Sequence, residues 1–244
     1  MKQGIFEIAE NIPLTPNVYR MTLRGDASAV TAPGQFIQIR LEGLYLRRPL
    51  SVYDAEADSI AIIYKIVGRG TEQMSRLAAG ETLNVLTGLG NGFDLALSGD
   101  HPLLVGGGVG VPPLYLLARR LIAQGKRVSA VLGFNTGKEV FCEDAFRALG
   151  ASVTVTTADG SHGVKGFVTD ALPEHYTHLY ACGPLPMLKA VCHRAKTDGQ
   201  FSFEERMGCG FGACMGCSRK TAAGSKRICR EGPVFRKEEI LWED

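Results

Sequence analysis

Apolar and polar residues alternate over short runs in the first part of the chain, which is the pattern of half-buried β-strands. The expected strands lie at 18–23, 36–41, 59–67 and 82–86. Glycine, proline and asparagine separate them, and several short strands at this spacing predict a small antiparallel barrel. Residues 71–79 differ, because Thr71 can cap a short helix that Gly80 ends.

After residue 97 the pattern changes to short apolar runs that alternate with helical periodicity. The expected strands lie at 103–105, 128–134, 153–157, 178–182 and 201–203. The expected helices lie at 112–123, 143–149, 167–172 and 185–196. Strands that alternate with helices form βαβ units, so residues 98–204 predict a doubly wound parallel sheet.

The last part of the chain, residues 205–244, is rich in glycine and cysteine and has almost no periodic apolar pattern. A segment of about 40 residues needs a staple such as a bound metal to hold a fold. The sequence therefore divides into a β-barrel at 1–97, an α/β domain at 98–204 and a small C-terminal segment at 205–244.

Composition narrows the classes of protein that this pattern allows. The 244 residues are 45% hydrophobic and 21% charged, which is ordinary for a globular protein with its own core. The 27 basic and 25 acidic residues nearly balance, which excludes the global positive field of a nucleic-acid-binding protein. The longest uncharged stretch, Pro102 to Ala118, falls short of the roughly 20 apolar residues of a spanning helix. With no apolar signal at the N-terminus, we expect a cytoplasmic protein whose thiols stay reduced.

Four of the seven cysteines crowd into the C-terminal segment. They are Cys209, Cys214, Cys217 and Cys229, in the spacing C-x4-C-x2-C-x11-C. The first three have the spacing of plant-type 2Fe–2S ferredoxins, in which two irons each take two thiolates. Glycines at 208, 210, 212 and 216 permit the unusual dihedral angles of a loop that wraps such a cluster. A structural zinc site is the alternative, but it usually brings two C-x2-C-type pairs, so the spacing favours iron–sulfur.

The same segment is strongly basic. Between Arg206 and Arg230 it carries six basic residues and no acidic one. This charge can raise the potential of a cluster or contact a partner, and it is equally consistent with a solvated loop. The sequence leaves these interpretations open.

A glycine-rich loop follows the first expected strand of the α/β domain and opens a helix. Residues 108–113 have the form G-x-G-x-x-P, and Gly106, Gly108 and Gly110 let a pyrophosphate approach the backbone. A tight strand-to-helix turn without a ligand is the alternative. Cys182, Gly183 and Pro184 end a later strand, so both loops face the crevice at the carboxyl ends of the strands. Taken alone, Cys182 is more typical of a small buried apolar residue.

Arg48, Pro49, Leu50 and Ser51 lie in the β region. Strand alternation places Arg48 and Leu50 on one face and Ser51 on the other. Arginine suits bidentate contact with phosphate, and a hydroxyl can both donate and accept. Alone, the tetrapeptide is more typical of an edge strand with a solvated arginine. Residues 68–71 precede the expected short helix and can place backbone N–H groups on a second phosphate.

Taken together, a barrel with R-x-x-S and a second domain with G-x-G-x-x-P and C-G-P resemble the ferredoxin–NADP reductase superfamily. The resemblance covers residues 1 to about 204 and implies FAD on the barrel and a nicotinamide nucleotide on the second domain. The usual superfamily motif is Arg-x-Tyr-Ser/Thr. Leu50 replaces the tyrosine that stacks on the flavin, so this stacking must come from elsewhere.

The resemblance also implies roles for individual residues. For FAD, Arg48 holds the pyrophosphate and Ser51 bonds the flavin edge, with Pro49 and Leu50 completing the motif. Ile63, Tyr64 and Lys65 lie along the adenosine or ribityl part, and Gly70 and Thr71 meet the pyrophosphate. For NAD, Gly106, Gly108 and Gly110 admit the pyrophosphate, and Cys182, Gly183 and Pro184 border the nicotinamide.

The C-terminal segment narrows the resemblance. The chain resembles the electron-transfer subunits of type B dihydroorotate dehydrogenases at residues 202–214, 229–235, 159–161 and 165–170. This family implies a separate FMN-containing catalytic subunit that oxidises dihydroorotate in pyrimidine biosynthesis, in a complex of two subunits of each kind. Electrons then pass through the 2Fe–2S cluster and FAD to NAD+.

Two alternative functions stay open. One is the small subunit of the NADH-dependent ferredoxin–NADP oxidoreductase that bifurcates electrons, whose first cluster ligand is an aspartate where this chain has Cys209. The other is a non-catalytic interaction module with zinc in the terminal loop.

The choice between NAD and NADP is also open on the residues. Residues 133–136 lack the acidic residue that would bind a ribose, and Lys138 is near enough to meet a 2′-phosphate. NAD follows from the resemblance alone. Cys142 and Cys192 are expected to be packing residues.

Overall fold

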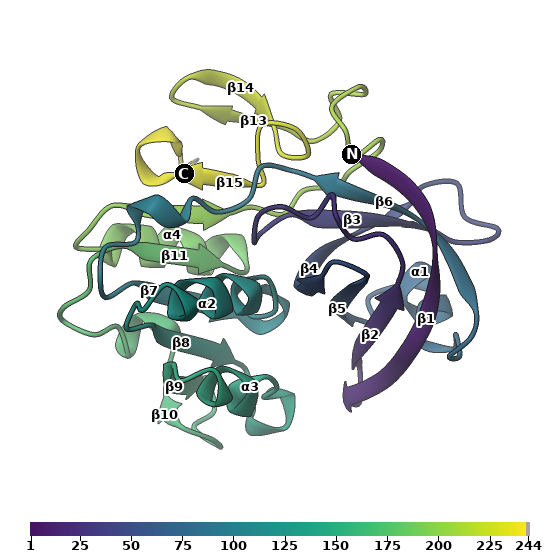
Figure 1. The fold of residues 1–244 in the computed structure, drawn as a ribbon. Helices are drawn as coiled ribbons and strands as arrows, with labels where there is room; N and C mark the ends of the chain where they lie inside the picture. The colour runs from purple at the N-terminus through teal and green to yellow at the C-terminus, as the bar shows by residue number, and fades with distance from the viewer. Residues whose placement is uncertain (243–244) are drawn as a thin grey trace.

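The computed structural model describes residues 1–242 as a barrel, an α/β domain and a C-terminal segment that lies across both (Figure 1). Six antiparallel strands close the barrel in the order β1-β2-β5-β4-β3-β6. They are β1 (Lys2–Thr15), β2 (Val18–Arg24), β3 (Phe36–Arg40), β4 (Arg48–Glu56), β5 (Ser59–Lys65) and β6 (Thr82–Leu89). Side chains alternate along β3, so that Ile37 and Ile39 fill the barrel interior. The predicted antiparallel barrel is confirmed.

Three features of the barrel differ from the sequence prediction. β1 was missed because only Phe6, Ile8 and Thr15 of its fourteen residues are buried, which leaves little alternation. The length of β4 was missed because Pro49 weakens its strand signal. The helix α1 (Arg69–Ser75) begins before Thr71 and ends before Ala79. The Thr71 hydroxyl accepts from the Val67 N–H at 2.9 Å and donates to the Gly68 carbonyl at 3.1 Å, so it closes the preceding turn.

The α/β domain has a seven-stranded sheet in the order β10-β9-β8-β7-β11-β12-β15. The strands are β7 (Leu103–Gly107), β8 (Ser129–Phe134), β9 (Ser152–Thr157), β10 (Val164–Lys165), β11 (Leu179–Cys182), β12 (Gly199–Ser202) and β15 (Val234–Arg236). All neighbouring pairs are parallel except β12 with β15, which confirms the predicted parallel sheet.

Helices cover both faces of this sheet. The helices are α2 (Pro113–Ala123), α3 (Glu143–Ala148) and α4 (Leu185–Arg194), and 3-10 turns lie at Leu95–Leu97, Gly108–Gly110, Gly137–Glu139, Val168–Asp170 and Lys237–Glu239. The helix expected at 167–172 is thus a single 3-10 turn. None of the described helices is long and apolar enough to span a membrane.

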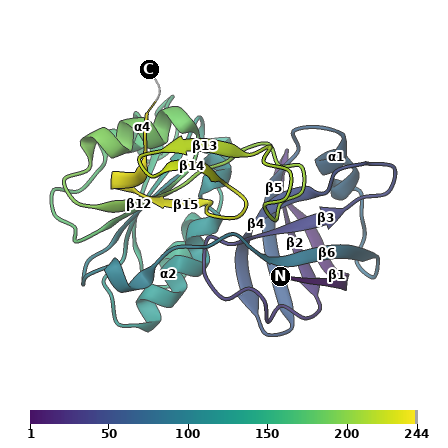
Figure 2. The ribbon, with the colours of Figure 1, turned by 90° about the horizontal axis from the view of Figure 1, so that it is seen from above.

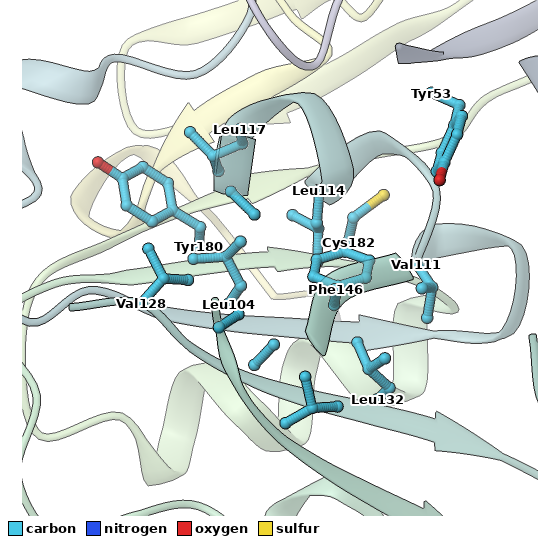
Figure 3. Close-up of a cluster of buried hydrophobic side chains, with 14 of the residues drawn as sticks. Tyr53, Leu104, Val111, Leu114, Leu117, Val128, Leu132, Phe146, Tyr180 and Cys182 are labelled. Atoms are coloured by element: carbon cyan, nitrogen blue, oxygen red, sulfur yellow. The ribbon is translucent and has the colours of Figure 1, made fainter. Parts of the chain in front are cut away.

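Alternation along the central strands separates two apolar cores. Leu104 and Tyr180 pack with Leu114 and Leu117 of α2 and with Phe146 of α3 (Figure 3). Their neighbours in β7 and β11 face the opposite side, where α4, the outer face of the barrel and the C-terminal segment pack together. The second core therefore joins all three parts of the molecule.

The C-terminal segment contains three strands that the sequence pattern does not predict. β13 (Ser218–Thr221) and β14 (Gly224–Arg227) form a hairpin, and β15 pairs antiparallel with β12 at the edge of the parallel sheet (Figure 2). Ile228 and Phe235 are buried in the second core. The segment was predicted to need a bound metal to hold a fold, and strand pairing and apolar packing also fix its ends.

The linker between the barrel and the α/β domain also holds this segment. The Asn91 side chain donates to the carbonyls of Val234 at 2.7 Å and Glu231 at 3.1 Å, and accepts from the Val234 N–H at 3.1 Å. The Asn91 N–H donates to the Gly232 carbonyl at 2.7 Å. These bonds fix the chain where it enters β15.

Candidate cofactor sites

A cavity of about 650 Å³ opens at the carboxyl ends of the parallel strands and extends to the barrel. Its lining includes Gly108 and Gly110 from the loop after β7, Gly183 and Pro184 from the loop after β11, and Lys65 from β5. The two loops that the sequence singled out therefore meet at one cavity. This is the position at which open α/β sheets bind dinucleotides.

Two residues predicted for the nucleotide site do not line this cavity. Gly106 is buried, and a Cβ on it would lie 2.9 Å from a methyl group of Val111. Cys182 is buried in the first core beside Leu114 and Val111 (Figure 3). Burial, followed by the charge of Glu204, raises the pKa of the Cys182 thiol to about 12. Both residues therefore lie behind the cavity wall.

Gly110 ties the two loops together. A Cβ at this position would collide with the carbonyl oxygen of Cys182 and lie 2.6 Å from the α-carbon of Gly183. Only glycine lets the two backbones approach this closely. The glycine at 110 is therefore required by loop-to-loop packing as well as by access for a ligand.

Sequence reasoning missed a carboxylate in the cavity lining, that of Glu139. Glu139 ends the 3-10 turn after β8, and its Oε2 accepts from the N–H of Asn135 at 3.3 Å. The end of β8 has no acidic residue of its own, but the 3-10 turn places the Glu139 carboxylate beside it. This is the place from which a carboxylate meets the ribose hydroxyls of a dinucleotide. Lys138 points elsewhere, because it is exposed and absent from the lining.

Glu204 is a second carboxylate that the sequence did not single out. It follows β12, lines the cavity, and lies close enough to Cys182 to influence its thiol. Glu204 is exposed, but the surrounding protein partly desolvates its carboxyl and so raises the pKa of this group. Glu204 lies in the stretch 202–214 that carries the family resemblance, but no role of its own was predicted for it from the sequence.

The predicted flavin motif meets the turn before α1. A Cβ placed on Gly70 would collide with Nε of Arg48 and would lie 3.0 Å from its Cζ, so the guanidinium stem crosses the start of α1. Two stretches that are remote in sequence and were assigned to one pyrophosphate therefore come together. Thr71 contributes backbone here, because its hydroxyl is committed to Val67 and Gly68.

The rest of the motif follows strand alternation. Leu50 pairs with Ile37 and packs against the barrel core, whereas Ser51 pairs with Phe36 on the outer face. Pro49 pairs with Gln38 on this outer face too. Ser51 therefore stands opposite to Leu50, as predicted.

The three predicted residues of β5 point in different directions. Ile63 packs in the first core, and Lys65 lines the large cavity. The Tyr64 side chain is buried in the barrel, where its hydroxyl donates to Asn11 Oδ1 at 2.9 Å. Tyr64 can therefore offer a ligand only its backbone.

The four cysteines of the C-terminal segment stand as two pairs. The N–H of Cys209 lies 3.4 Å from Sγ of Cys214, and the N–H of Cys214 lies 3.4 Å from Sγ of Cys209. The Cys229 N–H lies 3.4 Å from Sγ of Cys217. In residues 1–242 no three metal-ligating side chains gather as they would around a single ion. Two pairs suit a 2Fe–2S cluster, in which each iron takes two thiolates.

Electrostatics differ between the pairs. Burial disfavours ionisation of Cys209, but the N–H groups of Cys214, Phe211 and Ala213 outweigh it and lower the pKa of this thiol to about 6. Burial, and then the Cys217 thiol, raise the pKa of Cys229 to about 12. Inward-pointing amides at Cys209 favour a thiolate, which is the form that binds iron.

Several of the basic residues in this segment have partners from just outside the stretch 206–230. Lys226 pairs with Glu239, and Arg227 pairs with Glu231 and donates to the Gly212 carbonyl at 2.6 Å. The guanidinium of Arg219 lies 4.4 Å from the ring centre of Phe203. Lys226, Arg227 and Arg219 therefore make contacts that stabilise the C-terminal segment.

Comparisons with known proteins agree with this geometry. The model of the iron–sulfur cluster binding domain of dihydroorotate dehydrogenase B matches residues 204–241, and an oxidoreductase NAD-binding domain matches residues 104–193. The dihydroorotate dehydrogenase B (NAD+) electron transfer subunits of Shouchella clausii and of a Geobacillus species are each 43% identical to this chain. The alignment with the first covers 98% of both chains, and the alignment with the second covers 99% of both chains.

Solved structures of other proteins have a similar fold. The structure of an NADH-dependent reduced ferredoxin–NADP oxidoreductase, studied for electron bifurcation, has a TM-score of 0.88 at 32% identity. The aligned region covers 98% of this chain and 90% of the chain in that structure. A ferredoxin NADP+ reductase from Neisseria gonorrhoeae has a TM-score of 0.69 at 18% identity, over 80% and 90% of the two chains.

The fold and the paired sites define a reductase of the ferredoxin–NADP reductase type with an added iron–sulfur domain. Within that class, the chain belongs to the family of dihydroorotate dehydrogenase B (NAD+) electron transfer subunits.

Proposed function

We propose that this chain carries electrons from a dihydroorotate-oxidising partner to NAD+, in pyrimidine biosynthesis. It binds FAD on the barrel, NAD in the large cavity, and a 2Fe–2S cluster through Cys209, Cys214, Cys217 and Cys229. When bound, the cluster supplies single-electron transfer and the flavin supplies the hydride that NAD+ accepts. The residues of this chain bind and orient these groups, and the transfer needs no general base from it.

The orientation of the two cysteine pairs carries this proposal. Cys214 is exposed, and the apolar Phe211 and Met215 beside it are 42% and 55% exposed. Cys217 and Cys229 are buried in the second core, which also contains Phe36 on the outer face of the barrel. A segment that carries electrons needs one side exposed to the donor and the other side packed against the acceptor domain. In the C-terminal segment, Cys214 lies on the exposed side, and Cys217 and Cys229 lie on the packed side.

The flavin residues bind and position rather than react. Arg48 offers a planar cation for the pyrophosphate beside the backbone of Gly70 and Thr71. Ser51 presents a hydroxyl to the flavin edge, Pro49 and Leu50 shape the strand between them, and Ile63, Tyr64 and Lys65 border the rest of the molecule. Tyr64 contributes backbone only, since its side chain is bonded to Asn11.

The nucleotide residues surround the large cavity. Gly108 and Gly110 admit the pyrophosphate, Gly183 and Pro184 border the nicotinamide, and Glu139 accepts from a ribose hydroxyl. Gly106 and Cys182 hold the two loops from behind. This division follows from which of these residues line the cavity.

The partner is an FMN-containing catalytic subunit, in a complex of two subunits of each kind in the cytoplasm. The names of the relatives, which call them electron transfer subunits, support a separate catalytic subunit. The exposed rim of Phe211, Cys214 and Met215 is the surface on which we place it. The seven unpaired thiols of the described chain suit a reducing compartment.

Metal analysis tests the cluster. The purified chain should contain about two irons and two sulfides, and Cys217→Ser should lose both. Cys192→Ser is the matched control, because Cys192 is also a buried thiol but lies in α4. Stoichiometric zinc without iron would instead support the non-catalytic module.

Reconstitution tests the pathway. Mixed with the FMN-containing subunit, the chain should restore reduction of NAD+ by dihydroorotate. If the complex forms with all cofactors bound and yet no NADH appears, the pathway is wrong although the cofactors are right. Reduction of ferredoxin instead would favour the bifurcating type, to which the chain is 32% identical.

Flavin retention tests the motif. Arg48→Ala should release FAD on gel filtration, because the pyrophosphate loses its cation. Arg47→Ala is the control, since the guanidinium of this neighbour is bonded to Asn84 of β6. Equal FAD content in both variants would remove Arg48 from the site.

A further inference from the structure

The cluster-binding loop lies on a buried amide that has no partner. Gln38 is in the middle of β3, and none of its surface is exposed. Neither Nε2 nor Oε1 of its side chain has a hydrogen-bond partner among the described residues. A buried amide left unpaired is costly, and such groups in native proteins usually have a partner.

The amide is aimed at the loop that carries the first cysteines. A Cβ built on Gly210 would collide with Nε2 of Gln38 and would lie 2.7 Å from its Oε1. Gly210 also has a φ of +78°, which favours glycine. The carboxamide therefore occupies the space beside the α-carbon of Gly210, the residue that follows Cys209.

The same side chain stands beside the flavin motif. Gln38 pairs with Pro49 across the β3–β4 ladder, and Phe36 pairs with Ser51. Paired residues of antiparallel strands share a face, and Ser51 is the diagonal neighbour of Gln38 at about 7–8 Å. Gln38 is thus in contact with the cluster-binding loop and adjacent to the strand assigned to the flavin.

We propose that the Gln38 carboxamide is a positioning residue for the cluster, and that its otherwise unpaired N–H donates to a sulfide of the bound cluster and so helps to set the reduction potential. This inference rests on the proposed cysteine ligation. Of the two ends of the amide, only the N–H end suits a thiolate or sulfide, since both are acceptors. A donor to sulfur stabilises the extra negative charge of the reduced cluster and so raises its potential.

Gln38→Met tests the proposal, because it keeps the length of the side chain and removes the donor. The purified holoprotein should keep two irons and two sulfides per chain. Its cluster should be harder to reduce, with an equilibrium constant lowered about threefold to tenfold, tenfold being about 59 mV for one electron. The electron paramagnetic resonance spectrum of the reduced cluster should change as well. The flavin potential should stay the same.

Gln200→Met is the matched control. Gln200 is equally buried, but its side chain accepts from the Asp94 N–H at 2.8 Å and donates to the Asp94 carbonyl at 2.9 Å. This variant should lose thermal stability and leave the cluster potential unchanged. Gln38→Met removes an unpaired amide, so the metal-free protein should be no less stable than the original.

Three results separate the possible errors. A full cluster in Gln38→Met with an unchanged potential and spectrum would overturn the role of Gln38, since the amide then bonds a water or only packs. Absence of iron from the unmodified protein would overturn the proposed function itself. If Gln38→Met loses the cluster, the reduction potential is measured in Gln38→Glu instead, because glutamate has the same side-chain shape as glutamine. Ionised glutamate lacks the donor, and an unaltered potential there would refute the proposal.

Discussion

The proposed choice of nucleotide depends on a single carboxylate in the large cavity, that of Glu139. Glu139 reaches the end of β8 by way of a 3-10 turn, and its Oε2 is held by the Asn135 N–H. A carboxylate at this place bonds ribose hydroxyls and repels a 2′-phosphate. The residues at the strand end leave the choice between NAD and NADP open, and we propose that Glu139, placed by the 3-10 turn, makes it.

Glu139→Gln should weaken binding of NAD+ about tenfold, because a hydrogen bond to a charged group is worth about 1.5–3 kcal/mol. Discrimination against NADP+ should fall with it. Equilibrium titration of both nucleotides measures this. Lys138→Gln is the control and should alter neither, since Lys138 is exposed and outside the cavity lining. Selectivity unchanged in Glu139→Gln would move the ribose elsewhere.

A buried histidine gives the α/β domain a pH dependence. His178 is 5% exposed, and its Nε2 lies 3.2 Å from Nε2 of Gln200. Burial lowers the pKa of His178. The unfolded chain therefore takes up a proton more readily than the folded chain, and the free energy of unfolding falls as pH drops below about 6.5.

His178→Gln should flatten this slope in the free energy of unfolding between neutral and mildly acidic pH. Denaturant titrations at several pH values measure it. His175→Gln, at an exposed position, should keep the slope of the original protein. Parallel slopes in all three proteins would show that other groups set the acid sensitivity.

At the scale of elements, prediction succeeded where the apolar pattern is local. The central strands β7, β8 and β11 are continuous apolar runs, and the cysteine spacing marks the cluster segment by itself. β15 was missed because it has only three residues and its partner β12 lies far away in the sequence. Gln38 and Glu139 were missed for a related reason, since each depends on a contact that no spacing records.

The linker illustrates such a contact, because one asparagine holds the entry to β15. Asn91→Ala removes three side-chain hydrogen bonds to Glu231 and Val234, and should lower the free energy of unfolding by about 2 kcal/mol. Thermal unfolding measures the loss. Asn84→Ala is a control whose bonds to Arg47 stay within the barrel. We expect faster proteolysis near residue 232 in Asn91→Ala alone. Equal cleavage in Asn91→Ala and Asn84→Ala would show that Asn91 does not hold the chain where it enters β15.

At the scale of the whole molecule, the second core joins barrel, sheet and C-terminal segment. Phe36 of the barrel, Leu188 of α4 and Phe235 of β15 belong to one apolar cluster. The three parts therefore share one apolar core, which also contains Cys217 and Cys229.

Removal of iron by a chelator should accordingly leave the barrel and the sheet folded. Far-ultraviolet circular dichroism should change little, and protease cleavage should concentrate between residues 205 and 217. The hairpin and β15 should resist, because strand pairing and packing hold them. Cooperative unfolding of the whole chain on loss of iron would show instead that metal supplies the stability of the segment.

The antiparallel pairing of β12 with β15 has a consequence for how this architecture arose and can be reused. Ser202 pairs with Val234, so the chain leaves the sheet and returns to it at adjacent points, about 4.8 Å apart between strands. Everything between them is an insert whose two ends meet. An insert of this kind can be excised and replaced by a short turn, or transplanted to the equivalent edge of a reductase that lacks it, without rethreading either fold.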